Sequence, residues 1–241
     1  MNELEKAIKI TKKYGEKYGG WTNEQVKNRL ISGKKVRILN SKLEIKDENY
    51  KEKMGLAKKF TEKYLKNIEN ILMVGVTGSV AAENPKKNDD IDLMIIIKKD
   101  CLWIVRLKVF IIFWIYKIPH RTNKNDICIN LWLDEEALTI PKEKQNLRNA
   151  MDLILMKSVL NKNMTYEKFI LANKWARKYV RNGFDMKTLN SKLKILNKKI
   201  KNNYWEKIIN LIMFAGQYWY MKKKINKELV DEHRAFFHPN D

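Results

Sequence analysis

The spacing of apolar residues changes twice along the chain. In residues 1–70, and again from about residue 145 onward, apolar residues recur at intervals of three and four, which is typical of helices that bury one face. The later part is expected to form helices over 146–160, 165–182 and about 186–222. Between these parts, the runs 71–76, 91–97 and 127–133 are apolar and of strand length. The pattern predicts an α+β fold in which a small sheet is preceded by an N-terminal helical segment and followed by a C-terminal helical bundle. We expect the boundaries of these three units to be 1–70, 71–140 and 141–241.

A longer apolar segment, residues 101–119, raises the question of a membrane span. Arg106, Lys108 and Lys117 interrupt it, and its longest uninterrupted run is the eight residues 109–116. Because about 20 apolar residues are needed to cross a bilayer, we expect a buried connecting helix and no transmembrane span. Association with a membrane surface is the alternative.

Two further features bear on location. The N-terminus MNELEKAIKI contains acidic residues and no apolar stretch, so no signal peptide is expected. Cys101 and Cys128 lie in apolar surroundings without a CxxC or Cys/His metal-ligand spacing. Buried thiols in a reducing compartment are therefore expected, which favours the cytoplasm.

Charge is strongly positive and unevenly distributed. The chain has 49 Lys+Arg against 28 Asp+Glu, for a net charge of +21. Residues 71–150 are nearly neutral, with 12 basic and 10 acidic residues, while both flanks are basic. This distribution favours a polyanionic partner such as RNA, bound around a central site. The alternative is that these residues, most of them lysine, are simply solvated.

Two aspartates stand at the entrance of the second apolar run, in the stretch GVTGSVAAENPKKNDDIDLMIII of residues 75–97. Alternation along a strand puts Asp90, Asp92 and Met94 on one face and the odd-numbered Ile and Leu residues on the other. Two aligned carboxylates repel each other unless a cation lies between them. Mg²⁺ suits such a site because it binds one or two carboxylates together with substrate phosphates. Asp89, by contrast, is typical of a turn.

The turn before this stretch supplies a complementary feature. Gly78-Ser79 follows the first apolar run, where a glycine lets the backbone approach a phosphate closely and a helix start offers N–H groups to it.

Taken together, these residues resemble the nucleotidyltransferase superfamily of DNA polymerase β. The family pattern is an apolar strand, Gly-Ser, about ten residues, and then Asp-x-Asp entering a second strand. Here Gly78-Ser79 is followed by ten residues and then by Asp90-x-Asp92. The resemblance covers residues 71–97 and, more loosely, 71–134. It implies a small mixed sheet of the nucleotidyltransferase type, a site for two Mg²⁺ ions, and transfer of a nucleoside monophosphate from an NTP such as ATP to an acceptor hydroxyl.

The resemblance also implies roles for individual residues. Asp90 and Asp92 would hold metal, and a third carboxylate from a later strand would help to activate the acceptor hydroxyl. We assign this third position to Asp126, which opens the run 127–133; Asp134 and Asn130 are the alternatives.

The same resemblance assigns the phosphates of the NTP to other residues. Gly78, Ser79 and the nearby backbone would contact the phosphates. Lys86 and Lys87, in the loop before the aspartates, would stabilise the charge of the triphosphate, unless they are merely solvated.

Two functions are therefore expected from the sequence. The first is a nucleotidyltransferase whose acceptor is RNA or a tRNA-like molecule, a protein hydroxyl or a small molecule. The second is a catalytically weakened module of the same fold that binds RNA or a protein partner. A third carboxylate within about 5 Å of Asp90 and Asp92, the reach of one bridging ion, would favour the enzyme.

Overall fold

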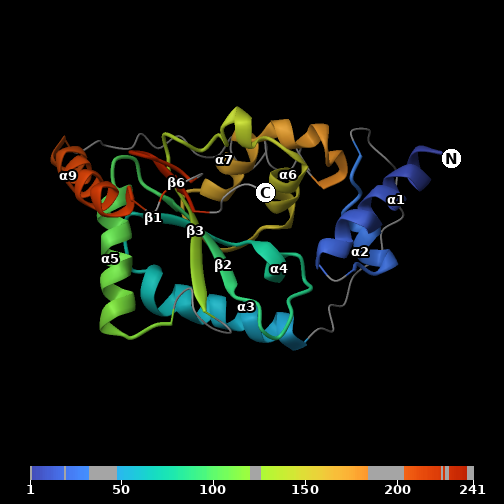
Figure 1. Cartoon of the computed structure of the whole chain (residues 1–241), viewed down its shortest axis with the longest axis horizontal. Helices are drawn as coiled ribbons and strands as arrows, with labels where there is room; N and C mark the ends of the chain where they lie inside the picture. The colour runs from blue at the N-terminus through green and yellow to red at the C-terminus, as the bar shows by residue number, and fades with distance from the viewer. Residues whose placement is uncertain are drawn as a thin grey trace.

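A six-stranded mixed sheet forms the centre of the molecule, with strand order β4-β1-β2-β3-β6-β5. The computed structural model describes residues 2–18, 20–32, 48–119, 126–183, 204–223, 225 and 228–237. The strands are β1 (Ile71–Val76), β2 (Ile91–Ile97), β3 (Ile127–Asp134), β4 (Lys157–Asn161), β5 (Leu229–Asp231) and β6 (Arg234–Phe236). Helices cover both faces of this sheet (Figure 1). The mixed α+β class expected from the sequence is confirmed.

The three apolar runs of the sequence are the three central strands. β1 pairs antiparallel with β2, and β2 pairs parallel with β3. A parallel pair needs a long crossover connection, and α5 (Leu102–Ile115) provides it between β2 and β3. The parallel pairing matters for the site because it brings the start of β2 next to the start of β3.

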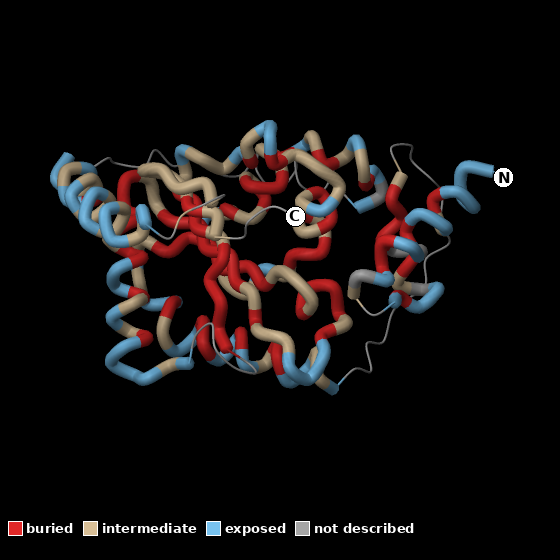
Figure 2. Tube along the Cα trace, in the orientation of Figure 1, coloured by how far each residue is buried: buried red, intermediate tan, exposed pale blue. Residues whose placement is uncertain are grey.

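Each face of the sheet has its own hydrophobic core. The odd-numbered residues of β2 pack with α3 (Glu48–Phe60) and α5 on one face. Met94 and Ile96 lie on the other face, with α6 (Leu147–Leu155) and α7 (Thr165–Ala172). The buried strands run through the middle of the molecule in Figure 2. The predicted alternation along β2 is thus confirmed, and Asp92 shares its face with Met94.

The carboxyl-terminal region is not only helical, which corrects the expected helical bundle. The end of the helix expected over 146–160 is instead part of β4, residues 157–161, which pairs with β1. β5 and β6 then extend the sheet beyond β3. Helical spacing alone could not reveal these strands, because pairing with β1 and β3 decides their conformation. Of the long helix expected over 186–222, α9 (Tyr204–Met221) is described; residues 184–203 lie outside the described part of the chain.

The amino-terminal helices α1 (Glu3–Gly15) and α2 (Asn23–Asn28) are tied to the sheet by a buried ionic network. Arg29 donates a hydrogen bond to Glu83, which also pairs with the Lys157 ammonium at 2.8 Å. Burial raises the pKa of Glu83, but Lys157 and Arg29 outweigh it and hold the pKa below its usual value. The network joins the end of α2, the segment after β1, and β4.

α5 is the connecting helix expected over residues 101–118. Trp103, Val105 and Val109 are buried, whereas Trp114 and Ile115 near its end are 81% and 57% exposed. Among the described residues, no helix combines the length and the apolarity needed to cross a bilayer.

The carboxyl end of β3 carries a buried carboxylate paired with a histidine. Asp134 is 0% exposed. One of its oxygens lies 2.8 Å from His233 Nδ1, and the other accepts the backbone N–H of Glu136 at 2.9 Å. The backbone N–H of Asp134 donates to the carbonyl of His233. This pair fastens the turn between β5 and β6 to β3, at the end of the strand opposite to Asp126.

Stability is expected to decrease as the pH rises above the ordinary histidine pKa of about 6.5. Burial lowers the pKa of His233, but the hydrogen bond and charge of Asp134 outweigh it and raise the pKa overall. A pKa raised by folding contributes stability that is complete below the unfolded pKa and is lost as pH rises through the folded pKa. Burial raises the pKa of Asp134, against the effect of His233. The contribution of Asp134 to stability therefore also decreases with rising pH, but at lower pH than that of His233.

Thermal unfolding midpoints of the wild type and of His233→Gln, measured at increasing pH above about 6.5, test the expectation. The wild-type midpoint should fall with pH more steeply than that of the variant. Equal slopes would show that the pair does not control the pH dependence.

Candidate functional site

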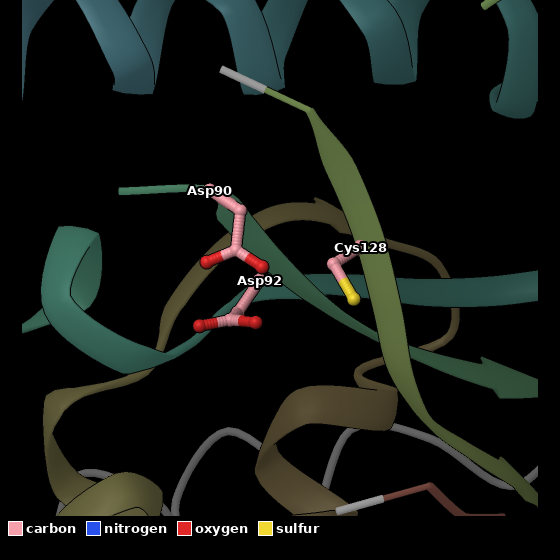
Figure 3. Close-up of side chains that lie close together, drawn as sticks. All are labelled: Asp90, Asp92 and Cys128. Carbon is pink, nitrogen blue, oxygen red and sulfur yellow. The ribbon is translucent and has the colours of Figure 1, made fainter. Parts of the chain in front are cut away.

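Asp90 and Asp92 lie at the beginning of β2, side by side and half-buried. The Ile91 N–H between them donates to the Asp126 carbonyl at 2.8 Å, which fixes the start of β2 against the start of β3. Because alternate residues of a strand face the same way, both carboxylates leave the sheet on the Met94 face. Figure 3 shows them together at this edge.

The third member of this cluster is a thiol. Cys128 is opposite Asp92 in the β2–β3 register, and Figure 3 shows its side chain beside those of Asp90 and Asp92. Asp90, Asp92 and Cys128 each offer one ligand atom within 4.8 Å of the other two, and Asp126 is not a member of this group. Asp126 is instead buried, at 2% exposure, next to the start of β3. No third carboxylate joins Asp90 and Asp92 at this distance among the described residues, so the condition expected to favour the enzyme over the binding module is not met there.

Asn130 connects the thiol to Asp92. The β2–β3 register shifts between Leu93 and Met94, which leaves Asn130 as the extra residue of a bulge in β3. Bulges re-aim side chains in this way. The Asn130 amide nitrogen donates to Asp92 Oδ1, and its carbonyl oxygen accepts from Cys128 Sγ at 2.9 Å. Asn130, the alternative for the third position, therefore lies at the site, where it hydrogen-bonds to Asp92 and is not a member of the ligand cluster.

The Gly78 turn packs directly against Asp92. Gly78 has a φ of +63° and begins the short helix α4 (Gly78–Ala81). A Cβ at this position would overlap Asp92 Oδ2 and lie 3.1 Å from its Cγ. The N–H of Thr77, the preceding residue, donates to the Asp92 carbonyl at 2.9 Å. The absence of a side chain at Gly78 therefore leaves the room that the Asp92 carboxylate occupies.

The loop that precedes the carboxylates is anchored by a buried lysine. Lys53 of α3 is 1% exposed, and its ammonium donates to the Asp89 carbonyl at 2.6 Å and to the Lys87 carbonyl at 3.3 Å. The Asp89 side chain accepts the Lys86 N–H at 2.9 Å, in agreement with its expected turn role. The side chains of Lys86 and Lys87 are exposed and lie on this loop.

Replacing Lys53 by methionine is expected to lower the free energy of unfolding by about 2 kcal/mol, because the carbonyls of the loop lose a charged donor inside the protein. Urea unfolding measures the effect. Lys58→Met is the matched control, since Lys58 is exposed on the same helix, and it should leave the stability within about 0.5 kcal/mol of the wild type. A Lys53→Met variant as stable as this control would contradict the anchoring role.

A cavity of about 650 Å³ is lined in part by residues that contact Asp92. Thr77 and Asn130, which both hydrogen-bond to Asp92, form part of its wall. Opposite them lie α6 and the aromatic side chains of Tyr14 and Tyr18. Ligand pockets of proteins have volumes of about 300–1,000 Å³, so the cavity has room for a nucleotide-sized molecule.

Charged groups of both signs line this cavity. Lys144 and Arg148 bring positive charge, and Asp152 lies one helical turn beyond Arg148. Burial raises the pKa of Tyr18, and the negative charge of Asp152 adds to this effect. The tyrosine is therefore a neutral hydrogen-bonding group at ordinary pH. Tyr14, Tyr18 and Arg148 could not be identified from the sequence, because only the tertiary structure brings them to one cavity.

The donors present fit a divalent metal ion. Two half-buried carboxylates are hard oxygen ligands of the type that Mg²⁺ and Mn²⁺ bind, and Gly78 gives the Asp92 carboxylate the room to lie in the cluster. The fit to the expected two-ion site is less complete, because the third group of the cluster is a thiol. Cys128 lies at the alternate position after Asp126, which opens the same run, and this alternation is the signal that could have indicated it, although the sequence suggested only a buried thiol.

Comparison with known proteins adds no identification: no protein-family model, no curated protein and no solved structure matches the chain.

Proposed function

We propose that the protein is a metal-dependent nucleotidyltransferase, which transfers a nucleoside monophosphate from an NTP to an acceptor hydroxyl. One observation carries the proposal: two aligned carboxylates and a glycine turn meet next to Thr77 and Asn130, which line a cavity of about 650 Å³. Aligned carboxylates are unfavourable without a cation, and a glycine turn at their side gives a phosphate close access to the backbone.

In this proposal the residues at the start of β2 and in the Gly78 turn have distinct roles. Asp90 and Asp92 hold the metal, which supplies Lewis-acid activation of the hydroxyl and neutralises phosphate charge when bound. Gly78 and Ser79 bind the phosphates through the backbone of the turn. Asn130 holds the Asp92 carboxylate in place through its amide hydrogen bond.

The cavity between α6 and the two tyrosines accommodates the nucleoside. Tyr14 and Tyr18 offer ring faces and hydroxyl groups to a base and sugar, and Arg148 offers positive charge. Lys86 and Lys87 are exposed on the loop before Asp90, where they can approach a triphosphate.

The acceptor belongs to the same proposal. The net charge of +21 favours a polyanion such as RNA, held through its phosphates. Much of the lysine-rich sequence, residues 187–201, lies outside the described part of the chain. Both cysteines are buried and neither forms a disulfide, which is in keeping with the cytoplasm that we propose as the location.

The test is an incubation of the protein with each NTP labelled at the α-phosphate, with Mg²⁺ or Mn²⁺, and with total RNA or cell extract. We expect label in one acceptor fraction, which names the acceptor class as RNA, protein or small molecule. Label in no fraction with any metal would refute transfer.

A second function is favoured by one feature, the thiol in place of a third carboxylate. A site with only two carboxylates can hold a metal and a nucleotide without activating a hydroxyl, and the protein would then be a binding module. Tight binding of a labelled NTP together with no transfer to any acceptor would support this reading.

A further inference from the structure

The cluster at the start of β2 combines two kinds of metal donor. Asp90 and Asp92 offer hard oxygen atoms, and Cys128 offers a soft sulfur atom within 4.8 Å of both. Mg²⁺ takes oxygen ligands, whereas thiolates select softer ions such as Zn²⁺ and Co²⁺. The three ligands come from the neighbouring starts of β2 and β3, so the register of the sheet holds them together.

We propose that this centre selects a thiophilic divalent transition-metal ion over Mg²⁺, with the Cys128 thiolate as its third protein ligand. The inference deepens the proposed function, on which it rests for the role of the metal. The class of ion follows from the two oxygen donors and one sulfur donor of the cluster. Cys128 is then a metal ligand, whereas the sequence suggested only a buried thiol.

Two other features favour an ion at this place. Gly78 leaves the room that the Asp92 carboxylate occupies, because a Cβ there would overlap Asp92 Oδ2, and this holds the carboxylate in the cluster. The cavity of about 650 Å³ begins at Asn130 and Thr77, so an ion in the cluster has room on one side for ligands that the protein does not supply. A three-ligand site with an open position is the arrangement of catalytic zinc sites.

Asn130 hydrogen-bonds to two of the three ligands. It accepts from Cys128 Sγ at 2.9 Å and donates to Asp92. When the thiol becomes a ligand it releases one proton to solvent for each ion bound, and its hydrogen bond to Asn130 is given up. The amide keeps its contact with Asp92, as outer-layer groups do around metal ligands.

Titration of the metal-free protein with Co²⁺ and Cd²⁺ tests the inference, because a thiolate bound to either ion gives an ultraviolet charge-transfer absorption that carboxylates do not. The decisive variant is Cys101→Ala. Cys101 is the other cysteine, buried at the start of α5, so Cys128 is the sole thiol of that variant. We expect the band in the wild type and in Cys101→Ala, and its loss in Cys128→Ser. Competition should show that Mg²⁺ displaces Cd²⁺ only at large excess in Cys101→Ala.

No charge-transfer band in Cys101→Ala, or an unchanged band in Cys128→Ser, would overturn the inference. This experiment tests the metal ligand independently of the proposed function, because the spectra are recorded without enzymatic turnover. A band without nucleotide transfer refutes the transferase and leaves the metal ligand standing. Transfer supported by Mg²⁺ in a protein that shows no band refutes the thiolate ligand alone.

Discussion

Replacing Asp92 by asparagine is expected to reduce the affinity for Mn²⁺ by at least about 100-fold, since even groups outside the ligand shell change metal affinity about 10–100-fold. The variant keeps an oxygen that can accept from Asn130, so the hydrogen bond survives while the charge is lost. Mn²⁺ binding followed by electron paramagnetic resonance measures the effect. Nucleotide transfer should fall by at least a similar factor.

Stability in the absence of metal should change in the opposite direction. Neutralising Asp92 removes the repulsion from Asp90, and neighbouring like charges on a sheet cost up to about 1 kcal/mol. The free energy of unfolding of the metal-free variant is therefore expected to equal or exceed that of the wild type. A residue kept for structure alone would show the reverse.

Asp89→Asn is the matched control for this experiment. Asp89 is the neighbouring aspartate, and its side chain accepts only a turn hydrogen bond among the contacts given above. Its replacement should leave Mn²⁺ affinity within about threefold, because its carboxylate is outside the cluster. Equal losses in Asp89→Asn and Asp92→Asn would mean that general negative charge, and not this cluster, attracts the ion.

Gly78→Ala is expected to lower the free energy of unfolding by about 2–4 kcal/mol. A left-handed conformation costs a residue with a side chain about 1–2 kcal/mol, and the φ at this position is +63°. The added methyl group also overlaps Asp92 Oδ2, and overpacking of this kind costs about 1–3 kcal/mol. Displacement of the carboxylate should reduce Mn²⁺ affinity at least about tenfold, in the range of outer-layer effects.

The control for the glycine is Gly55→Ala. Gly55 lies within α3, and a Cβ there meets nothing within 4 Å. Alanine in a helix is more favourable than glycine by about 0.5–1 kcal/mol, so this variant should be slightly more stable. Urea unfolding measures the free energy of unfolding of both variants. If Gly78→Ala matched Gly55→Ala in stability and bound Mn²⁺ normally, Asp92 would not need the space at Gly78.

Much of the central fold could be predicted from local patterns. The runs 71–76, 91–97 and 127–133 match β1, β2 and β3 closely because buried strands have few polar residues. The faces of β2 followed from alternation alone, and this placed Asp92 on the side of Met94 correctly. The helix between β2 and β3 was evident from its length.

The outer strands could not be predicted in the same way. β4 follows α6 after one residue, Met156, and its apolar residues continue the helical spacing of that segment. β5 and β6 have three residues each, too few to show a period. These segments are strands because β1 and β3 offer open edges, which is information that lies elsewhere in the sequence.

The candidate site was predictable only in part, and for a related reason. Asp90, Asp92 and the Gly78 turn are close in sequence, so spacing could relate them. Cys128 lies next to Asp92 because of the register of β2 against β3, and Asn130 contacts Asp92 because of a bulge in β3. Neither the register nor the bulge follows from the composition of a single strand.

The strand order β4-β1-β2-β3-β6-β5 also bears on how the molecule assembles during synthesis. The three strands made first occupy the centre of the sheet, and their neighbours β4, β5 and β6 emerge later. β1 and β3 therefore keep unpaired edges while the ribosome is still adding residues, and such edges invite association with other chains. Contacts between distant parts of a sequence also slow folding. The nascent chain is thus most vulnerable to aggregation before residue 236 has been added.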